Sequence, residues 1–281
     1  MYWLLLFICI NSCALHFDRP MNFVTVADYE HYPWLSGLFT SIYKHNKNHE
    51  INIIVFDIGL LSEQVKALEA QNNIQVVPIE MVHPDLCKKF VVRKNGRLAR
   101  GWYAWKPVVF YQALNYFDYF LYIDSGMRVR APLDIIFAAI QQDGYFFYTC
   151  HHKIRPTITK YILNKFNLNQ RGRGSVLEHY GMLGGLQGLS KSMLTSYIKP
   201  MYELAHDLRN FEDDGTAPWG FGGARHDQSL FSLLARLSGY IIHDNFVTLD
   251  SKKISFKMDN FITVSKNIDE NILAAQCHLV G

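Results

Sequence analysis

Three aspartates stand at positions where a carboxylate could bind a divalent metal ion or accept a proton. Asp28, Asp57 and Asp124 each follow a short run of apolar and β-branched residues. Carboxylate oxygens bind Mg²⁺ and Mn²⁺, and a carboxylate can also act as a general base. An Asp at such a place can equally begin a turn. Three of them together indicate a site more strongly than one alone.

Two further segments suit a ligand site but also have plain structural interpretations. Gly184 and Gly185 lie in an apolar segment, 180–186, where glycine lets the backbone approach a ligand closely or marks a bulge. Asp227 directly precedes a helix with an apolar face, and Asp is among the best N-cap residues.

Apolar periodicity predicts the elements that must position these residues. The expected strands are 23–26, 51–56, 74–77 and 119–123, with helices that begin near Pro33, after Gly59 and before Phe110. This alternation predicts an α/β fold with a mostly parallel central sheet flanked by helices. In such sheets ligands bind beyond the carboxyl ends of the strands, which is where the three aspartates fall.

The second half of the chain is less regular. It predicts strands at 145–149 and 182–186, a helix that Ser190 caps and Pro200 ends, a loop over 210–224, a helix with Leu230, Phe231, Leu234 and Leu237 on its apolar face, and a late strand at 240–243. Neither a repeat nor a linker divides the chain, so residues 20–281 are expected to form one domain.

Composition excludes some classes of function. The 281 residues carry 28 basic and 25 acidic side chains, a net charge of +3, which does not favour a nucleic-acid-binding protein. The most basic segment, 88–100, is interpreted as a solvated loop, with a flexible segment near an anionic ligand as the alternative.

The N-terminal residues 1–14 carry no charge and end in the small residues Ser12-Cys13-Ala14. This pattern predicts a cleaved signal peptide, and a buried strand is the alternative. The apolar run is too short to span a bilayer, so we expect no transmembrane span in the mature chain. The leader predicts the secretory pathway, in the lumen of the endoplasmic reticulum or Golgi, or secretion.

The segment from Phe120 to Gly126 resembles the GT-A glycosyltransferases, and family 8 in particular. In that family an apolar strand ends in Asp-x-Asp, whose carboxylates hold a divalent metal against the donor diphosphate. Asp124 matches the first Asp, Ser125 the residue between, and Gly126 stands in place of the second Asp.

Other segments resemble the same family in chain order. The resemblance implies that Thr25, Ala27 and Asp28 hold the nucleoside, that Lys106 faces the diphosphate, and that the strand with Gly184 and Gly185 passes under the donor sugar. A surface lysine is the equally weighted alternative for Lys106.

The same resemblance extends to the end of the sequence. It implies that Asp227 and Gln228 lie near the anomeric carbon and the acceptor as catalytic residues. His278-Leu279-Val280-Gly281 matches the opening of the family's C-terminal His-x-x-Gly pattern. Asp124 and His278 would then hold Mn²⁺ or Mg²⁺.

The resemblance implies a GT-A fold and a glycosyltransferase that takes its sugar from a nucleotide-sugar, a uridine diphosphate sugar by family, with retention of configuration. The acceptor is not indicated, although Trp219 and Phe221 are candidate sugar-stacking surfaces. A GT-A-fold module that binds a sugar or a protein without turnover is the main alternative, because Gly126 is no metal ligand. A nucleotidyltransferase would need a glycine-rich phosphate loop after the first strand, and 26–30 contains no glycine.

Overall fold

The computed structural model describes residues 17–92, 98–170, 173–218, 224–244, 246–249, 252–255 and 258–264. The predicted leader at 1–14, the stacking candidates Trp219 and Phe221, and the predicted metal ligand His278 lie outside these residues. What the sequence indicates for them stays a prediction.

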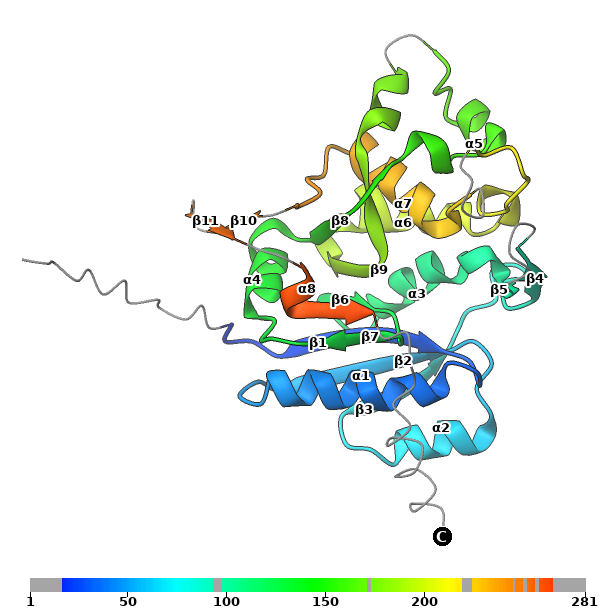
Figure 1. Ribbon diagram of the computed structural model, residues 1–281. Coiled ribbons are helices and arrows are strands. Elements are labelled where there is room, and N and C mark those ends of the chain that lie inside the picture. Colours follow the sequence, from blue (N-terminus) through cyan, green and yellow to red (C-terminus); the bar gives the residue numbers. More distant parts are fainter. Residues whose placement is uncertain are drawn as a thin grey trace, which may run out of the picture.

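A six-stranded sheet forms the centre of the molecule (Figure 1), with the strand order β3-β2-β1-β6-β9-β8. Its strands are β1 Met21–Ala27, β2 Ile51–Asp57, β3 Ile74–Pro78, β6 Tyr119–Ile123, β8 Phe146–Lys153 and β9 Tyr180–Ser190. β1, β2, β3 and β6 are parallel, whereas β9 runs antiparallel to both β6 and β8. The predicted mostly parallel α/β sheet is confirmed.

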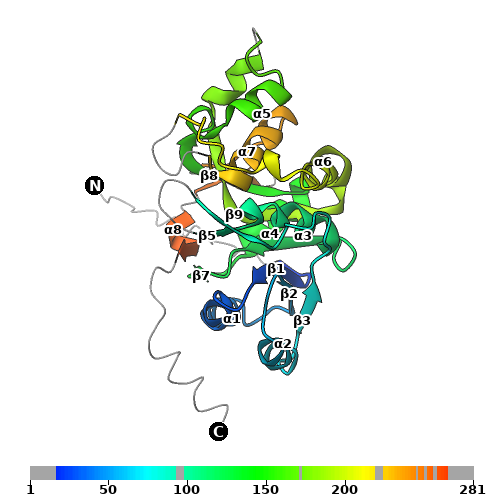
Figure 2. The same cartoon turned by 90° about the vertical axis from the view of Figure 1, so that its right-hand side faces the viewer.

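Helices cover both faces of this sheet because its strands are apolar on both sides. On β1, Val24 and Val26 face one core, and Phe23 and Ala27 face the other. Helices α1 Tyr32–His45, α2 Ser62–Glu69 and α4 Asp134–Asp143 contribute to the second core. Helices α3 Trp105–Ala113, α6 Lys199–Leu204 and α7 His226–Leu237 contribute to the first. Figure 2 shows α1 and α2 on one side of β1–β3, and α3 and α6 on the other.

The remaining elements are short. They are β4 Lys89–Val91, β5 Leu98–Arg100, β7 Met127–Val129, β10 Phe246–Leu249, β11 Lys252–Ser255, β12 Ile262–Val264, α5 Lys160–Lys165, α8 Met258–Phe261, the 3₁₀ turns 101–103, 155–157, 173–178, 191–193 and 208–210, and a π-helical turn, Leu194–Ile198. β12 pairs with β7, so residues 262–264 lie beside the strand that follows Gly126. No helix within the described ranges is long and apolar enough to cross a membrane.

Some expectations for the irregular half and the basic segment were wrong. The predicted loop at 88–100 instead has an antiparallel strand pair at its two ends, β4 with β5, in which Phe90 lies opposite Ala99. At 240–243 there is no strand, and His243 makes an isolated bridge to Tyr148. Pro200 lies within a continuous helical segment, just after the π-helical turn Leu194–Ile198, instead of ending a helix. Leu237 is 48% exposed at the end of α7.

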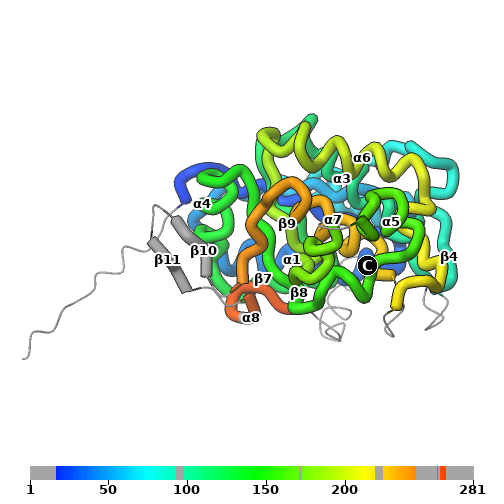
Figure 3. The backbone as a smooth tube through the Cα atoms, turned by 90° about the horizontal axis from the view of Figure 1, so that it is seen from above, coloured from blue at the N-terminus to red at the C-terminus, as the bar shows by residue number. Residues whose placement is uncertain are grey.

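A left-handed turn connects β5 to α3. Gly101, Trp102 and Tyr103 have φ values of +54°, +52° and +64°, and each non-glycine residue in this region costs about 1–2 kcal/mol. Packing holds the turn in place. The Trp102 ring stacks on His226, the first residue of α7, with 5.1 Å between ring centroids. Figure 3 shows α7, in orange, lying across β9. The strained turn therefore fixes the start of α3 against the start of α7.

We predict that Gly101→Ala lowers the free energy of unfolding by about 2–4 kcal/mol. A Cβ at Gly101 would collide with the Leu86 carbonyl group, which is backbone and has no room to yield. Gly239→Ala is the matched control, since Gly239 also has positive φ (+77°) but has nothing within 4 Å of an added Cβ. Urea unfolding should show a cost of about 1 kcal/mol for the control. Equal losses for the two variants would contradict the argument.

Candidate active site

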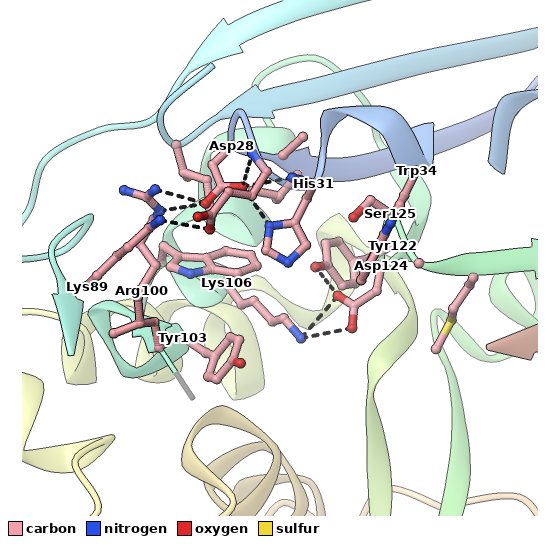
Figure 4. Close-up of a pocket in the computed structure, with 18 residues that line it drawn as sticks. Asp28, His31, Trp34, Lys89, Arg100, Tyr103, Lys106, Tyr122, Asp124 and Ser125 are labelled. Atoms are coloured by element: carbon pink, nitrogen blue, oxygen red, sulfur yellow. Dashed lines mark hydrogen bonds and ion pairs between the residues drawn. The ribbon is translucent and has the colours of Figure 1, made fainter. Parts of the chain in front are cut away.

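A pocket of about 250 Å³ opens at the carboxyl ends of β1 and β6. Its wall comes from the end of β1, the first turn of α1, the β4–β5 pair, the turn into α3 and the loop after β6 (Figure 4). Five predicted site residues line it, namely Ala27, Asp28, Lys106, Asp124 and Ser125. The sheet topology explains this, because β1 and β6 are parallel neighbours whose carboxyl ends meet at one edge.

Lys106 lies buried between two carboxylates. Its Nζ is 3.2 Å from Asp124 Oδ1, 3.1 Å from Asp227 Oδ2 and 3.2 Å from the carbonyl oxygen of Gly184. Only 6% of the Lys106 side chain and 8% of the Asp227 side chain is exposed, whereas 39% of Asp124 is. We call Lys106, Asp124 and Asp227 the charged trio. The surface-lysine interpretation of Lys106 is wrong.

The trio keeps its ammonium charged. Burial by itself lowers the pKa of Lys106, but the carboxylates of Asp124 and Asp227 outweigh it and raise that pKa above its usual value. Burial raises the pKa of Asp227, and the Lys106 ammonium offsets only part of this. Asp227 occupies the first turn of α7, but its side chain does not cap the helix, since the N-cap position is Arg225. Its interpretation as an N-cap is therefore wrong.

Asp124 is held from three sides. Tyr122 lies two residues earlier on β6, so it faces the same side of the sheet, and its hydroxyl donates to Asp124 Oδ1 at 2.5 Å. Burial raises the pKa of Tyr122 well above its usual value, which keeps the phenol protonated as a donor. The backbone N–H of Asp124 donates to the Gly185 carbonyl oxygen at 2.9 Å.

The glycines of β9 make room for the trio. A Cβ at Gly185 would collide with the Asp124 carboxylate, and a Cβ at Gly184 would lie 3.1 Å from Asp227 Oδ2. Neither glycine lines the pocket, and their expected contact with a donor sugar stays a prediction.

Asp28 forms a second buried cluster at the end of β1. Its Oδ1 accepts from the backbone N–H groups of Glu30 and His31 and lies 2.6 Å from His31 Nδ1. Its Oδ2 accepts from Arg100 Nε at 3.0 Å and Arg100 Nη2 at 2.8 Å. Burial raises the pKa of Asp28, but the bonds from His31 and Arg100 outweigh it and hold that pKa far below its usual range. Both oxygens already accept hydrogen bonds, so the carboxylate orients His31 and Arg100, and its contact with a nucleoside stays a prediction.

Three other expected residues stand away from the pocket. Thr25 is 1% exposed within β1, and its hydroxyl has no hydrogen-bond partner among the described residues. Gln228 lies on α7, where its Oε1 accepts from Arg225 at 3.2 Å. Asp57 closes a turn by accepting from the N–H groups of Gly59 and Leu60, both at 2.7 Å. The turn interpretation therefore holds for Asp57.

The pocket also contains residues that sequence reasoning did not select. Lys89 and Arg100 pair across β4 and β5, so one hairpin brings both cations to the rim. His31, at the N-cap position of α1, and Trp34, in its first turn, bring their rings edge to face at 5.1 Å. For Tyr122 the sequence did hold a local signal, because residues two positions apart on a strand face the same side and Tyr122 is two residues before Asp124.

Trp34 covers the position at which the family's second carboxylate would stand. A Cβ built on Gly126 would lie 3.1 and 3.2 Å from two carbon atoms of the indole ring. Even alanine would therefore press on the ring. The described residues contain no group of three His, Cys, Asp or Glu side chains arranged to hold a metal ion. Of the pocket residues in the loop after β6, Asp124 is the single carboxylate, and it is already paired with Lys106. Within the described part of the chain, which does not include the predicted ligand His278, the donor set does not make up a divalent metal centre.

Comparisons with known proteins identify the fold. No protein-family model and no curated protein matches the chain. A solved structure of the mannosyltransferase Ktr4p from S. cerevisiae in complex with GDP is similar, with a TM-score of 0.53 and 11% identity over 81% of this chain and 69% of that one. The likeness shows the fold, so the chain has the GT-A fold that its motifs predict.

Two other glycosyltransferases are similar to a lower degree. An active-site mutant of LgtC has a TM-score of 0.46 and 16% identity over 80% of this chain and 73% of that one. The bifunctional glycosyltransferase WbbM has a TM-score of 0.45 and 15% identity over 80% of this chain. The chain spans only 38% of the length of WbbM.

We predict that Lys106→Met lowers the free energy of unfolding at pH 7 by about 3–5 kcal/mol, because it leaves two carboxylates together without their ammonium. Adding Asp227→Asn should restore much of the loss. Lys191→Met is the control, since Lys191 pairs with Asp118 on the exposed surface and should leave the urea midpoint nearly unchanged. A loss no larger than that of the control would rule out the trio as a buried charge cluster.

Asp28→Asn should lower stability by about 3 kcal/mol at pH 7. The folded pKa of Asp28 lies below its usual value of 3.8, so its contribution is complete above that value and is lost as pH falls through the folded pKa. The difference in free energy of unfolding between the wild type and Asp28→Asn should stay at its full value between about pH 5 and 7. It should shrink under more acidic conditions. Asp207→Asn, at a carboxylate with a pKa of about 2 on the surface, is the control and should show a smaller loss. A pH-independent difference for Asp28→Asn would contradict this assignment.

Proposed function

We propose that the chain is a glycosyltransferase that takes a sugar from a nucleotide-sugar donor bound in the pocket at the ends of β1 and β6. The observation that carries the proposal is the charged trio, in which Lys106 joins Asp124 at the pocket wall to the buried Asp227. Such buried charge beside a cavity is typical of catalytic sites, and it stands here on a GT-A fold.

The pocket offers separate surfaces for the parts of such a donor. Val26, Ile58 and Leu98 supply apolar wall for a nucleoside, and Trp34 supplies an aromatic face. Trp105 also lines the pocket, and within the described residues its buried indole N–H has no hydrogen-bond partner. An oxygen of the bound donor would satisfy this N–H. A uridine diphosphate sugar is proposed from the family resemblance, with a guanosine donor as the next choice because Ktr4p is described with GDP.

The proposed chemistry places charge where charge develops. When the bond between the anomeric carbon and the diphosphate oxygen breaks, its electron pair leaves with the diphosphate, and the sugar becomes electron-poor. The Lys106 ammonium would stabilise the negative charge on the departing diphosphate, and the carboxylate of Asp124 would stabilise the electron-poor sugar. The acceptor oxygen forms the new bond, and its proton passes to the departing diphosphate.

Retention of configuration is proposed for a related reason. An inverting enzyme needs a carboxylate base that reaches the acceptor hydroxyl. Asp227 is buried, lies 3.1 Å from Lys106 Nζ and does not line the pocket, which supports a role in positioning Lys106 over a role as base. No acceptor is proposed. A place in the secretory pathway is proposed from the leader alone.

We predict that the protein hydrolyses a uridine or guanosine diphosphate sugar slowly in the absence of acceptor. Asp227→Asn keeps the shape of the side chain but removes the charge, and it should reduce the rate by about 10²–10³-fold. Lys191→Met, which is remote from the pocket, is the control. The preferred donor at about 100 times its dissociation constant should add about 2.7 kcal/mol of stability in a thermal-shift assay. Binding of nucleotide without any turnover would instead favour the non-catalytic module, and no binding would reject both.

A further inference from the structure

Gly126 and Trp34 form a matched pair in the proposed donor site. The indole ring lies so close to Gly126 that a carboxylate-bearing side chain there would require the ring to move. The face of the pocket opposite Lys106 is therefore aromatic where the fold family places a metal ligand. Whatever meets the charge of a bound diphosphate on that face has to come from another residue.

His31 is the side chain that stands there. Its ring meets Trp34 edge to face, at an interplanar angle of 87°. Its Nδ1 lies 2.6 Å from Asp28 Oδ1, and the Asp28 side chain is only 3% exposed, while that of His31 is 48% exposed. Because Nδ1 is engaged by the carboxylate, the remaining ring nitrogen, Nε2, is directed away from Asp28. Figure 4 shows the imidazole between Asp28 and Asp124, facing the pocket.

The charged side chains around His31 are already paired with one another, so His31 is left to interact with a bound anion. From β1 and the turn after it come Asp28 and Glu30, from the β4–β5 pair Lys89 and Arg100, and from α3 and the loop after β6 Lys106 and Asp124. Lys89 is paired with Glu30 at 2.7 Å and Arg100 with Asp28 at 2.8 Å. The pocket wall carries three cations and three carboxylates, and Asp227 behind Lys106 adds a fourth carboxylate, so a diphosphate adds uncompensated negative charge. A hydrogen bond from the His31 ring to the diphosphate compensates part of it.

Resting on the proposed function, we propose that this site handles a nucleoside diphosphate without a divalent metal ion. His31, oriented through Nδ1 by Asp28, donates a hydrogen bond from Nε2 to a diphosphate oxygen. Lys106 supplies the second cation from the opposite side. The Trp34–Gly126 pair closes the place of the missing carboxylate. His31 is thereby a donor-binding residue, and Asp28 is the residue that positions it.

Titration calorimetry with UDP and with GDP tests the proposal directly on the full chain. The dissociation constant in EDTA should agree with that in MnCl₂ within about threefold. His31→Gln should weaken binding in EDTA by about tenfold, because it removes one charge-assisted hydrogen bond. A cooperative thermal unfolding transition verifies that His31→Gln is folded, although the lost contact with the buried Asp28 should lower its melting temperature.

The outcomes separate the two proposals. Binding that needs Mn²⁺ and disappears in EDTA overturns the metal-free site but leaves the proposed function intact. Absence of UDP and GDP binding under every condition overturns the proposed function itself.

A gain-of-function variant tests the Trp34–Gly126 pair. Trp34→Ala combined with Gly126→Asp provides both the carboxylate and the room for it, and nucleotide binding should then tighten at least tenfold with Mn²⁺ (on the order of one added charge-assisted contact). Trp34→Ala alone is the control and should stay insensitive to the metal. A folded double variant that ignores Mn²⁺ would refute the exchange of a metal ligand for the indole ring.

Discussion

The burial of the Lys106 ammonium is the constraint on which the rest of the site depends. An ammonium group removed from water is tolerated only when nearby carboxylates and carbonyl groups replace the solvent. Here they come from three separate places, the loop after β6, the first turn of α7 and the backbone of β9. The positions of α3, α7 and β9 are therefore coupled, and glycine at 184 and 185 is what allows them to come close enough.

Asp28 applies the same principle at the neighbouring strand. Its carboxylate gathers His31 from α1 and Arg100 from β5, so that one buried charge orders two surface elements. Because β1 and β6 are adjacent and parallel, the two clusters face each other across one pocket. Each cluster fixes its polar groups before a ligand arrives, which reduces the reorganisation that binding would otherwise require.

The sequence predicted what is local and missed what depends on distant packing. Apolar runs located β1, β2, β3 and β6, and the strand ends brought Asp28 and Asp124 to one edge. The partner of Lys106 was not predictable, because Asp227 reaches it only after α7 packs on β9; at the level of the sequence its position at a helix start suggested a cap. His31 and Arg100 were missed for the same reason, since they meet only through Asp28.

The left-handed turn at 101–103 has a consequence for the order in which the chain folds. β1, α1, β2, α2 and β3 follow one another along the chain, and their parallel pairing needs only short connections. The turn, by contrast, is stabilised by the contact of Trp102 with His226, which belongs to the far end of the sequence. Contacts between such distant segments form late. The strained turn and the ammonium of Lys106 would both lack partners in a folding intermediate without α7, so we expect the pocket to be completed late in folding.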